Sequence, residues 1–230
     1  MSSPITLQDF HAKALADYGI ADLWPEAVLK EAKTKKEHIT KEIDALETFP
    51  FVTIDGEDAK DFDDAIFCEF SDHGFHLKVA IADVSFYVKE GSALDFEAAK
   101  RTTSVYMPRK VVPMLPEKLS NELCSLQPNK RRRCLCIEMD FDKDGYINSY
   151  KFHRGIIKSV ARLTYTEVEN QLINGVKDSD YAESLKAAIA LFNKLIINKG
   201  YRGALDFTIS EPLVQTNSDG DIKHIADRKR

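Results

Sequence analysis

The 230-residue sequence predicts an α+β fold, in which helices pack against a mixed, mainly antiparallel sheet. Short runs rich in β-branched and aromatic residues follow one another at 51–54, 65–70 and 75–82, as strands joined by tight connections do. Segments with apolar residues at helical spacing lie before and after these runs, at 6–18 and 180–199. With 43% hydrophobic and 30% charged residues, a chain of this length can bury a substantial core.

The first 48 residues are expected to be helical and to link or pack against the rest of the chain. The apolar spacing over 6–18 predicts a helix that ends at Gly19. A second helix is expected after Pro25, continuing through the polar, lysine-rich sequence EAKTKKEHITKEI.

The segment between the first two strands is unusually acidic. From Asp55 to Asp64 it holds six carboxylates and one lysine, with apolar residues on both sides. Burying unpaired carboxylates is costly or raises their pKa, so a divalent cation is the simplest compensation, and all-oxygen sites suit Mg2+ or Mn2+. A strand ending at Asp55 and a turn through Gly56 would return Asp61, Asp63 and Asp64 towards it, as a two-metal phosphoryl-transfer site requires. Composition alone leaves a solvated acidic loop as the alternative.

Three features of the middle of the chain each allow two interpretations. Asp83 is expected to cap a helix or turn, although its place at a strand end could bring it near the acidic loop. A helix is expected at 92–103, followed by a proline-rich, rigid extended loop at 105–116 rather than a central strand. Tyr106 in this loop could stack a nucleobase or be an ordinary core residue. The basic run Lys130–Arg133 could hold phosphates or form a solvated strand edge.

Residues 140–148 imitate the start of an EF-hand calcium loop. Position twelve is Lys151, where a bidentate glutamate is required, and the flanking segments are β-like, so we expect a hairpin turn instead. Further on, Thr166 and Glu169 form a predicted capping box that opens a helix, and a closing β meander is expected from 205 to 226 with a turn at 217–220.

Charge and composition exclude little. The net charge is −5, and the acidic segment supplies all of it, so charge neither favours nor excludes a nucleic-acid partner. No apolar run approaches the ~20 residues that span a bilayer, and no secretory signal is visible, so we expect a cytoplasmic protein without a membrane partner. The cysteines lack metal-site spacing and are expected to be reduced, mostly buried thiols: Cys68, Cys124, Cys134 and Cys136.

Four stretches together resemble one family. They read TIDGEDAKDFDDA, IADVSFYVKEGSALDFEA, TSVYMPRKVVPMLPEKLSNELCSL and ARLTYTEV, and their order is that of the RNB catalytic domain of the RNase II/RNase R exoribonucleases. The loop GEDAKDFDD and the upstream WPEAV segment are more similar to the RNase R branch. The resemblance implies a helical connector at 1–48 and the N-terminal portion of an incomplete RNB fold at 49–230.

The resemblance also implies an activity and a site. The expected activity is 3′-to-5′ hydrolysis of single-stranded RNA to nucleoside 5′-monophosphates, with two Mg2+ ions that Mn2+ can replace. Asp55, Asp61, Asp63 and Asp64 would hold the metal ions, and Asp61 and Asp63 would be catalytic. Tyr106 and Arg109 would contact the RNA, and other RNA-decay proteins are candidate partners.

In the family, the catalytic domain continues with an SPIRRY-like arginine motif, and cold-shock-like and S1-type domains flank it. None of these occurs in this sequence. We therefore expect a fragment of a longer enzyme. The alternative is a catalytically incompetent RNA-binding or regulatory module of the RNB type.

Overall fold

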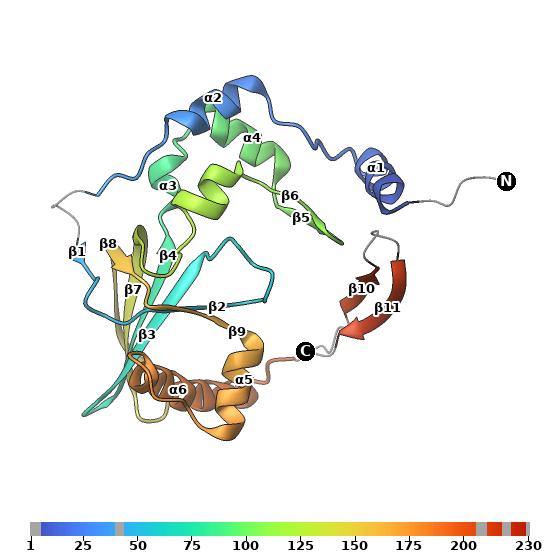
Figure 1. The fold of residues 1–230 in the computed structure, drawn as a ribbon. Helices are drawn as coiled ribbons and strands as arrows, with labels where there is room; N and C mark the ends of the chain where they lie inside the picture. The colour runs from blue at the N-terminus through green and yellow to red at the C-terminus, as the bar shows by residue number, and fades with distance from the viewer. Residues whose placement is uncertain (1–5, 40–43, 206–210, 218–221, 229–230) are drawn as a thin grey trace.

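A computed structural model describes residues 6–39, 44–205, 211–217 and 222–228 (Figure 1). Its centre is a seven-stranded sheet with the order β1-β8-β7-β4-β3-β2-β9. The strands are β1 (Asp44–Ala45), β2 (Val52–Asp55), β3 (Asp64–Ser71), β4 (Gly74–Ala82), β7 (Arg131–Asp142), β8 (Ile147–Lys158) and β9 (Ala161–Thr164). Only the β1–β8 and β2–β9 pairs of this sheet are parallel, so the predicted mixed, mainly antiparallel α+β fold is confirmed.

Helices gather at two places around the sheet (Figure 1). Near one end lie α2 (Glu26–Thr34), α3 (Val84–Tyr87), α4 (Ala93–Arg101) and the π-helical segment η1 (Lys118–Leu123). At the other end lie α5 (Tyr165–Asn174) and α6 (Ala182–Tyr201), while α1 (Leu7–Asp17) stands apart. None of the helices in the described ranges is long and apolar enough to cross a bilayer.

Two small hairpins lie outside the central sheet. One joins β5 (Val105–Met107) to β6 (Lys110–Val112), and the other joins β10 (Glu211–Thr216) to β11 (Ile222–Arg228). The proline-rich segment is therefore not a central strand, as predicted, but part of it pairs as a hairpin instead of forming an extended loop. The β10–β11 pair confirms the end of the expected meander; residues 206–210 and most of its turn lie outside the described residues.

The buried apolar side chains of the described residues form three clusters, the smallest of which joins Val52 of β2 to Leu163 of β9 and Leu185 of α6. The largest cluster lies under α2, α4 and η1 and includes Phe51, Phe67, Leu94, Leu119 and Leu126. The second packs α6 onto the sheet through Cys68, Phe75, Phe141, Ala187 and Leu191. Burying a large apolar side chain contributes roughly 1.5–3 kcal/mol, so these clusters fix the strands that carry the acidic segment.

Two tight turns of the central sheet are explained by the residues that form them. At Gly74, an added Cβ would meet the Phe141 carbonyl oxygen at 2.3 Å, so only glycine permits β4 to pair this closely with β7. Between β7 and β8, the Asp142 carboxylate accepts hydrogen bonds from the backbone of Asp144 and Tyr146, both at 2.9 Å, and Gly145 has φ +84°. This segment is a hairpin turn between β7 and β8, as predicted.

Two predicted helix boundaries were wrong. The capping box of α5 is formed by Thr164 and Glu167, because the chain leaves β9 at Thr164, two residues before the similar Thr166–Glu169 pattern. The second helix ends at Thr34 rather than continuing through the lysine-rich stretch. The following residues run extended, and Glu37 bonds to Arg132 at 3.1 Å. A tertiary contact therefore overrides local helix propensity.

Candidate active site

The acidic segment connects two neighbouring strands at the end of the sheet. Asp55 is the last residue of β2 and Asp64 the first of β3, with Asp61 and Asp63 in the loop between them. The two strands are antiparallel, with Val52 paired to Ile66. The chain therefore leaves at Asp55 and returns to the same end of the sheet, which is the arrangement that the apolar flanks predicted.

The four aspartates are close enough to act on one another electrostatically. Asp63 is exposed as a residue, but nearby protein atoms partly desolvate its carboxyl group. This desolvation, followed by repulsion from Asp61, Asp55 and Asp64, raises the pKa of Asp63 to about 6. Desolvation and repulsion also raise the pKa of Asp55, which Arg162 partly offsets. The acidic loop thus carries more carboxylates than neighbouring cationic side chains can neutralise.

The donor set fits a hard divalent cation. All four side chains offer carboxylate oxygens, the ligands that Mg2+ and Mn2+ prefer. Asp55 Oδ2 is buried and has no hydrogen-bond partner in the described part of the chain, so it is an oxygen that a cation could satisfy. Within the same part, no three His, Cys, Asp or Glu side chains are already arranged as a metal-binding group.

Two residues that sequence reasoning missed fix the backbone of this loop. Buried Ser125 accepts a hydrogen bond from the Phe62 amide at 3.1 Å and donates one to the Lys60 carbonyl at 2.8 Å. From the other side, Arg162 donates to the carbonyls of Gly56 and Glu57, the latter at 2.7 Å. Both lie within the family-like stretches, NELCSL and ARLTYTEV, but the pattern of either stretch alone gives no sign of this contact.

Tyr106 approaches the acidic loop from a different element. It lies on β5, is exposed, and its hydroxyl donates a hydrogen bond to Asp61 Oδ2 at 2.9 Å. Partial burial and this hydrogen bond raise the pKa of Tyr106. It is therefore not a core tyrosine, and its hydroxyl group contacts one of the four aspartates.

Arg109 lies two residues beyond the end of β5, at the tip of the same hairpin, with φ +59°. Its guanidinium donates to the Asn217 carbonyl at 3.5 Å, towards the β10–β11 hairpin. The structure therefore places Arg109 on the same hairpin as Tyr106.

Asp83 and two arginines of the basic run are buried. Asp83 occupies the N-cap position of α3, as predicted, but its side chain makes no capping hydrogen bond; its carboxylate lies 3.2 Å from Arg154 Nε and 3.9 Å from Arg133 Nε. Arg133 also stacks on Phe86, and Arg132 is buried against Glu37. The solvated-edge interpretation was wrong for these two arginines, which are 6% and 7% exposed, while phosphate binding by the run stays a prediction.

The fold and site together define an α+β domain with a carboxylate-rich loop at one end of a mixed sheet. The RNB domain matches residues 43–230, and the chain belongs to that family. This confirms the resemblance drawn from the sequence motifs.

Relatives and a solved structure agree with the assignment. Ribonuclease R of Acidithiobacillus ferrooxidans is 44% identical over 202 residues, covering 84% of this chain and 46% of that protein. Ribonuclease R of Escherichia coli K12 is 42% identical over 227 residues, covering 94% of this chain and 28% of that protein. The structure of Mycoplasma genitalium RNase R in complex with double-stranded RNA superposes with a TM-score of 0.91 at 32% identity, covering 96% of this chain and 40% of that one. The chain thus spans less than half the length of each.

Proposed function

We propose that this chain carries the metal-binding part of the catalytic site of a 3′-to-5′ exoribonuclease, which hydrolyses single-stranded RNA to nucleoside 5′-monophosphates. The observation that carries the proposal is the convergence of Asp55, Asp61, Asp63 and Asp64 at one loop, in a chain of the RNB family. The named relatives, each called Ribonuclease R or RNase R, support the substrate class.

The four aspartates would hold two Mg2+ ions, for which Mn2+ could substitute. When bound, such a pair of ions supplies stabilisation for the charge that develops on the attacking and leaving oxygens of a phosphodiester. The protein contributes a loop whose backbone is held by Ser125 and Arg162, so the adjustment needed to receive a ligand would fall mainly on the carboxylate side chains. Asp61 and Asp63, which lie inside the loop, remain the predicted catalytic residues.

Tyr106 and Arg109 would bind the RNA. An exposed tyrosine ring can stack on a terminal base, worth roughly 1–3 kcal/mol, and here the Tyr106 hydroxyl is already in contact with Asp61. Arg109 can neutralise a nearby phosphate. Together they would place the last phosphodiester of the strand beside the aspartates.

The remaining expectations are proposals of the same kind. Residues 1–48 would be the connector and 49–230 the first part of the catalytic domain. A cytoplasmic location is supported by the four cysteines, all of which are free thiols. Binding to other RNA-decay proteins stays a prediction.

The test is incubation of the purified chain with Mg2+ and a 5′-labelled single-stranded RNA, resolved on a gel. We expect a descending ladder that disappears in Asp63→Asn. The matched control is Asp58→Asn, which removes one charge from the same loop at an exposed position outside the predicted ligand set. RNA that is bound but remains intact would favour the non-cutting module, and equal loss in both variants would contradict the role given to Asp63.

A further inference from the structure

The β5–β6 hairpin, which carries Tyr106, has little support of its own. Its strands are three residues each, and they form a two-stranded sheet separate from the central one. Isolated two-stranded hairpins are marginally stable in water. What holds Tyr106 against Asp61 must therefore come from contacts outside the hairpin.

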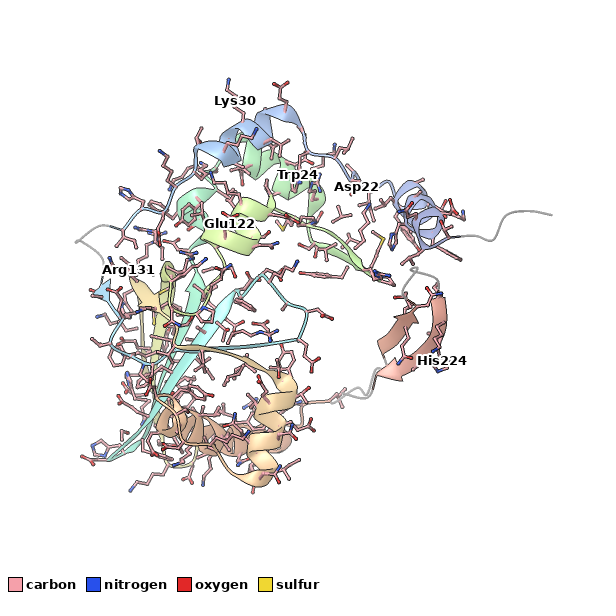
Figure 2. The ribbon with its side chains drawn as sticks, in the orientation of Figure 1. Asp22, Trp24, Lys30, Glu122, Arg131 and His224 are labelled. Carbon is pink, nitrogen blue, oxygen red and sulfur yellow. The ribbon has the colours of Figure 1, made fainter. Side chains whose placement is uncertain are left out.

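Those contacts come largely from the N-terminal segment, residues 6–24, which precedes the part of the chain that the RNB domain matches. At the hairpin tip, His11 Nε2 of α1 donates to the Pro108 carbonyl at 2.9 Å. At the start of β6, the Lys110 ammonium lies 2.5 Å from the Asp22 carboxylate. Figure 1 shows α1 close to the free end of the hairpin, and Figure 2 shows Asp22 on the connection between α1 and α2.

A third contact fixes the base of the hairpin. The buried side chain of Arg101 donates to the Pro113 carbonyl at 3.2 Å and to the Leu23 carbonyl at 2.9 Å. Its guanidinium also stacks on the Trp24 ring, 3.6 Å from the centroid. The tip, one strand and the base of the hairpin are thus each joined to the same N-terminal segment.

We propose that His11 and Asp22 are positioning residues for the RNA site, acting through Tyr106. The inference rests on the proposed function, because it assigns these residues to the binding of the RNA end. The N-terminal segment is then more than a linker: it holds the hairpin in the orientation in which the Tyr106 hydroxyl reaches Asp61. Neither His11 nor Asp22 itself contacts the aspartates in the hydrogen bonds and ion pairs of the described residues.

The first experiment asks whether the segment holds the hairpin, and it needs no RNA. Hydrogen exchange of the amides in 105–112 is compared in wild type, in His11→Ala with Asp22→Asn, and in Asp17→Asn. The control removes the same charge from the same segment, at a residue whose ion pair in the described part of the chain is with Lys13. We expect faster exchange in the double variant alone. Equal exchange in all three proteins would overturn the proposal.

The second experiment asks whether the effect passes through Tyr106. Affinity for a fluorescent single-stranded RNA is measured without divalent metal, in the native and the Tyr106→Ala background. Losing the two contacts is expected to weaken binding about fivefold when Tyr106 is present and not at all when it is absent. An equal loss in both backgrounds would show a role independent of Tyr106 and would contradict the inference.

A charge reversal protects the test against simple unfolding. Asp22→Lys with Lys110→Asp restores an ion pair of opposite polarity and should recover both slow exchange and RNA affinity, whereas Asp22→Lys alone should recover neither. If the wild-type chain binds no RNA, the proposed function fails, while the exchange experiment still decides whether the N-terminal segment positions the hairpin.

Discussion

Replacing Asp63 with asparagine should stabilise the metal-free chain at neutral pH. In the folded state the pKa of Asp63 is raised from 3.8 to about 6, first by desolvation and then by the neighbouring aspartates. Two pKa units correspond to about 3 kcal/mol if fully expressed. Because Asp63 is exposed as a residue, screening by solvent reduces this, and we expect a gain of about 1 kcal/mol.

The raised pKa also determines how the stability difference between wild type and variant should change with pH. A raised folded-state pKa means that the folded protein prefers the protonated carboxyl, so its contribution to stability is present below about pH 4 and is lost as pH rises through about 6. Above this range the wild-type chain carries the full repulsion and the asparagine variant does not. The advantage of the variant should therefore appear at about pH 7.5 and largely vanish at about pH 4.5.

The assay is thermal unfolding, followed by circular dichroism, in a buffer that contains a chelator to remove divalent metal. A gain of about 1 kcal/mol raises the Tm of a chain of this size by about 2–4 °C. Asp58→Asn serves as the control for removing a charge from the loop. A lower Tm for Asp63→Asn at about pH 7.5, or an equal gain at both pH values, would refute the electrostatic reasoning. Adding Mg2+ should reverse the order, because only the wild type keeps the full ligand set.

Three further predictions follow from the same contacts. Ser125→Ala removes both hydrogen bonds to the loop backbone and should lower the free energy of unfolding by about 1–3 kcal/mol in urea; an unchanged midpoint would contradict this. Mg2+ affinity, measured by calorimetry, should fall as pH drops below about 6, since a proton competes at Asp63, and constant affinity from about pH 7.5 to 5.5 would argue against Asp63 as a ligand. Tyr106→Phe should keep most RNA affinity and Tyr106→Ala should lose about 1–3 kcal/mol of it in a binding titration; equal losses would rule out stacking.

The sequence was informative wherever the controlling interaction is local. Apolar flanks and a glycine fixed the expectation that Asp55 and Asp64 end and begin neighbouring strands, and the register of β2 with β3 confirmed the strand pairing. The turn at Asp144 and Gly145 and the amphipathic pattern of α6 were predictable for the same reason. The approach of Tyr106 to Asp61 was expected only from the family resemblance, because 45 residues separate them.

Long-range contacts account for what was missed. Ser125 and Arg162 reach the acidic loop across 63 and 105 residues respectively, measured from Phe62 and Glu57, and neither has a local pattern that marks it. The early end of α2 has a similar cause, since Glu37 accepts a hydrogen bond from Arg132, 95 residues away. Propensity and periodicity describe a segment by itself and cannot report such partners.

The most direct test of the account is the location of bound metal. Crystals of the chain grown with Mn2+ can be examined for anomalous scattering at the acidic loop. The account predicts two ions about 4 Å apart, coordinated by Asp55, Asp61, Asp63 and Asp64, and their loss in Asp63→Asn. Ions bound elsewhere, or no ion at this loop at saturating Mn2+, would contradict the assignment of these aspartates as the metal site.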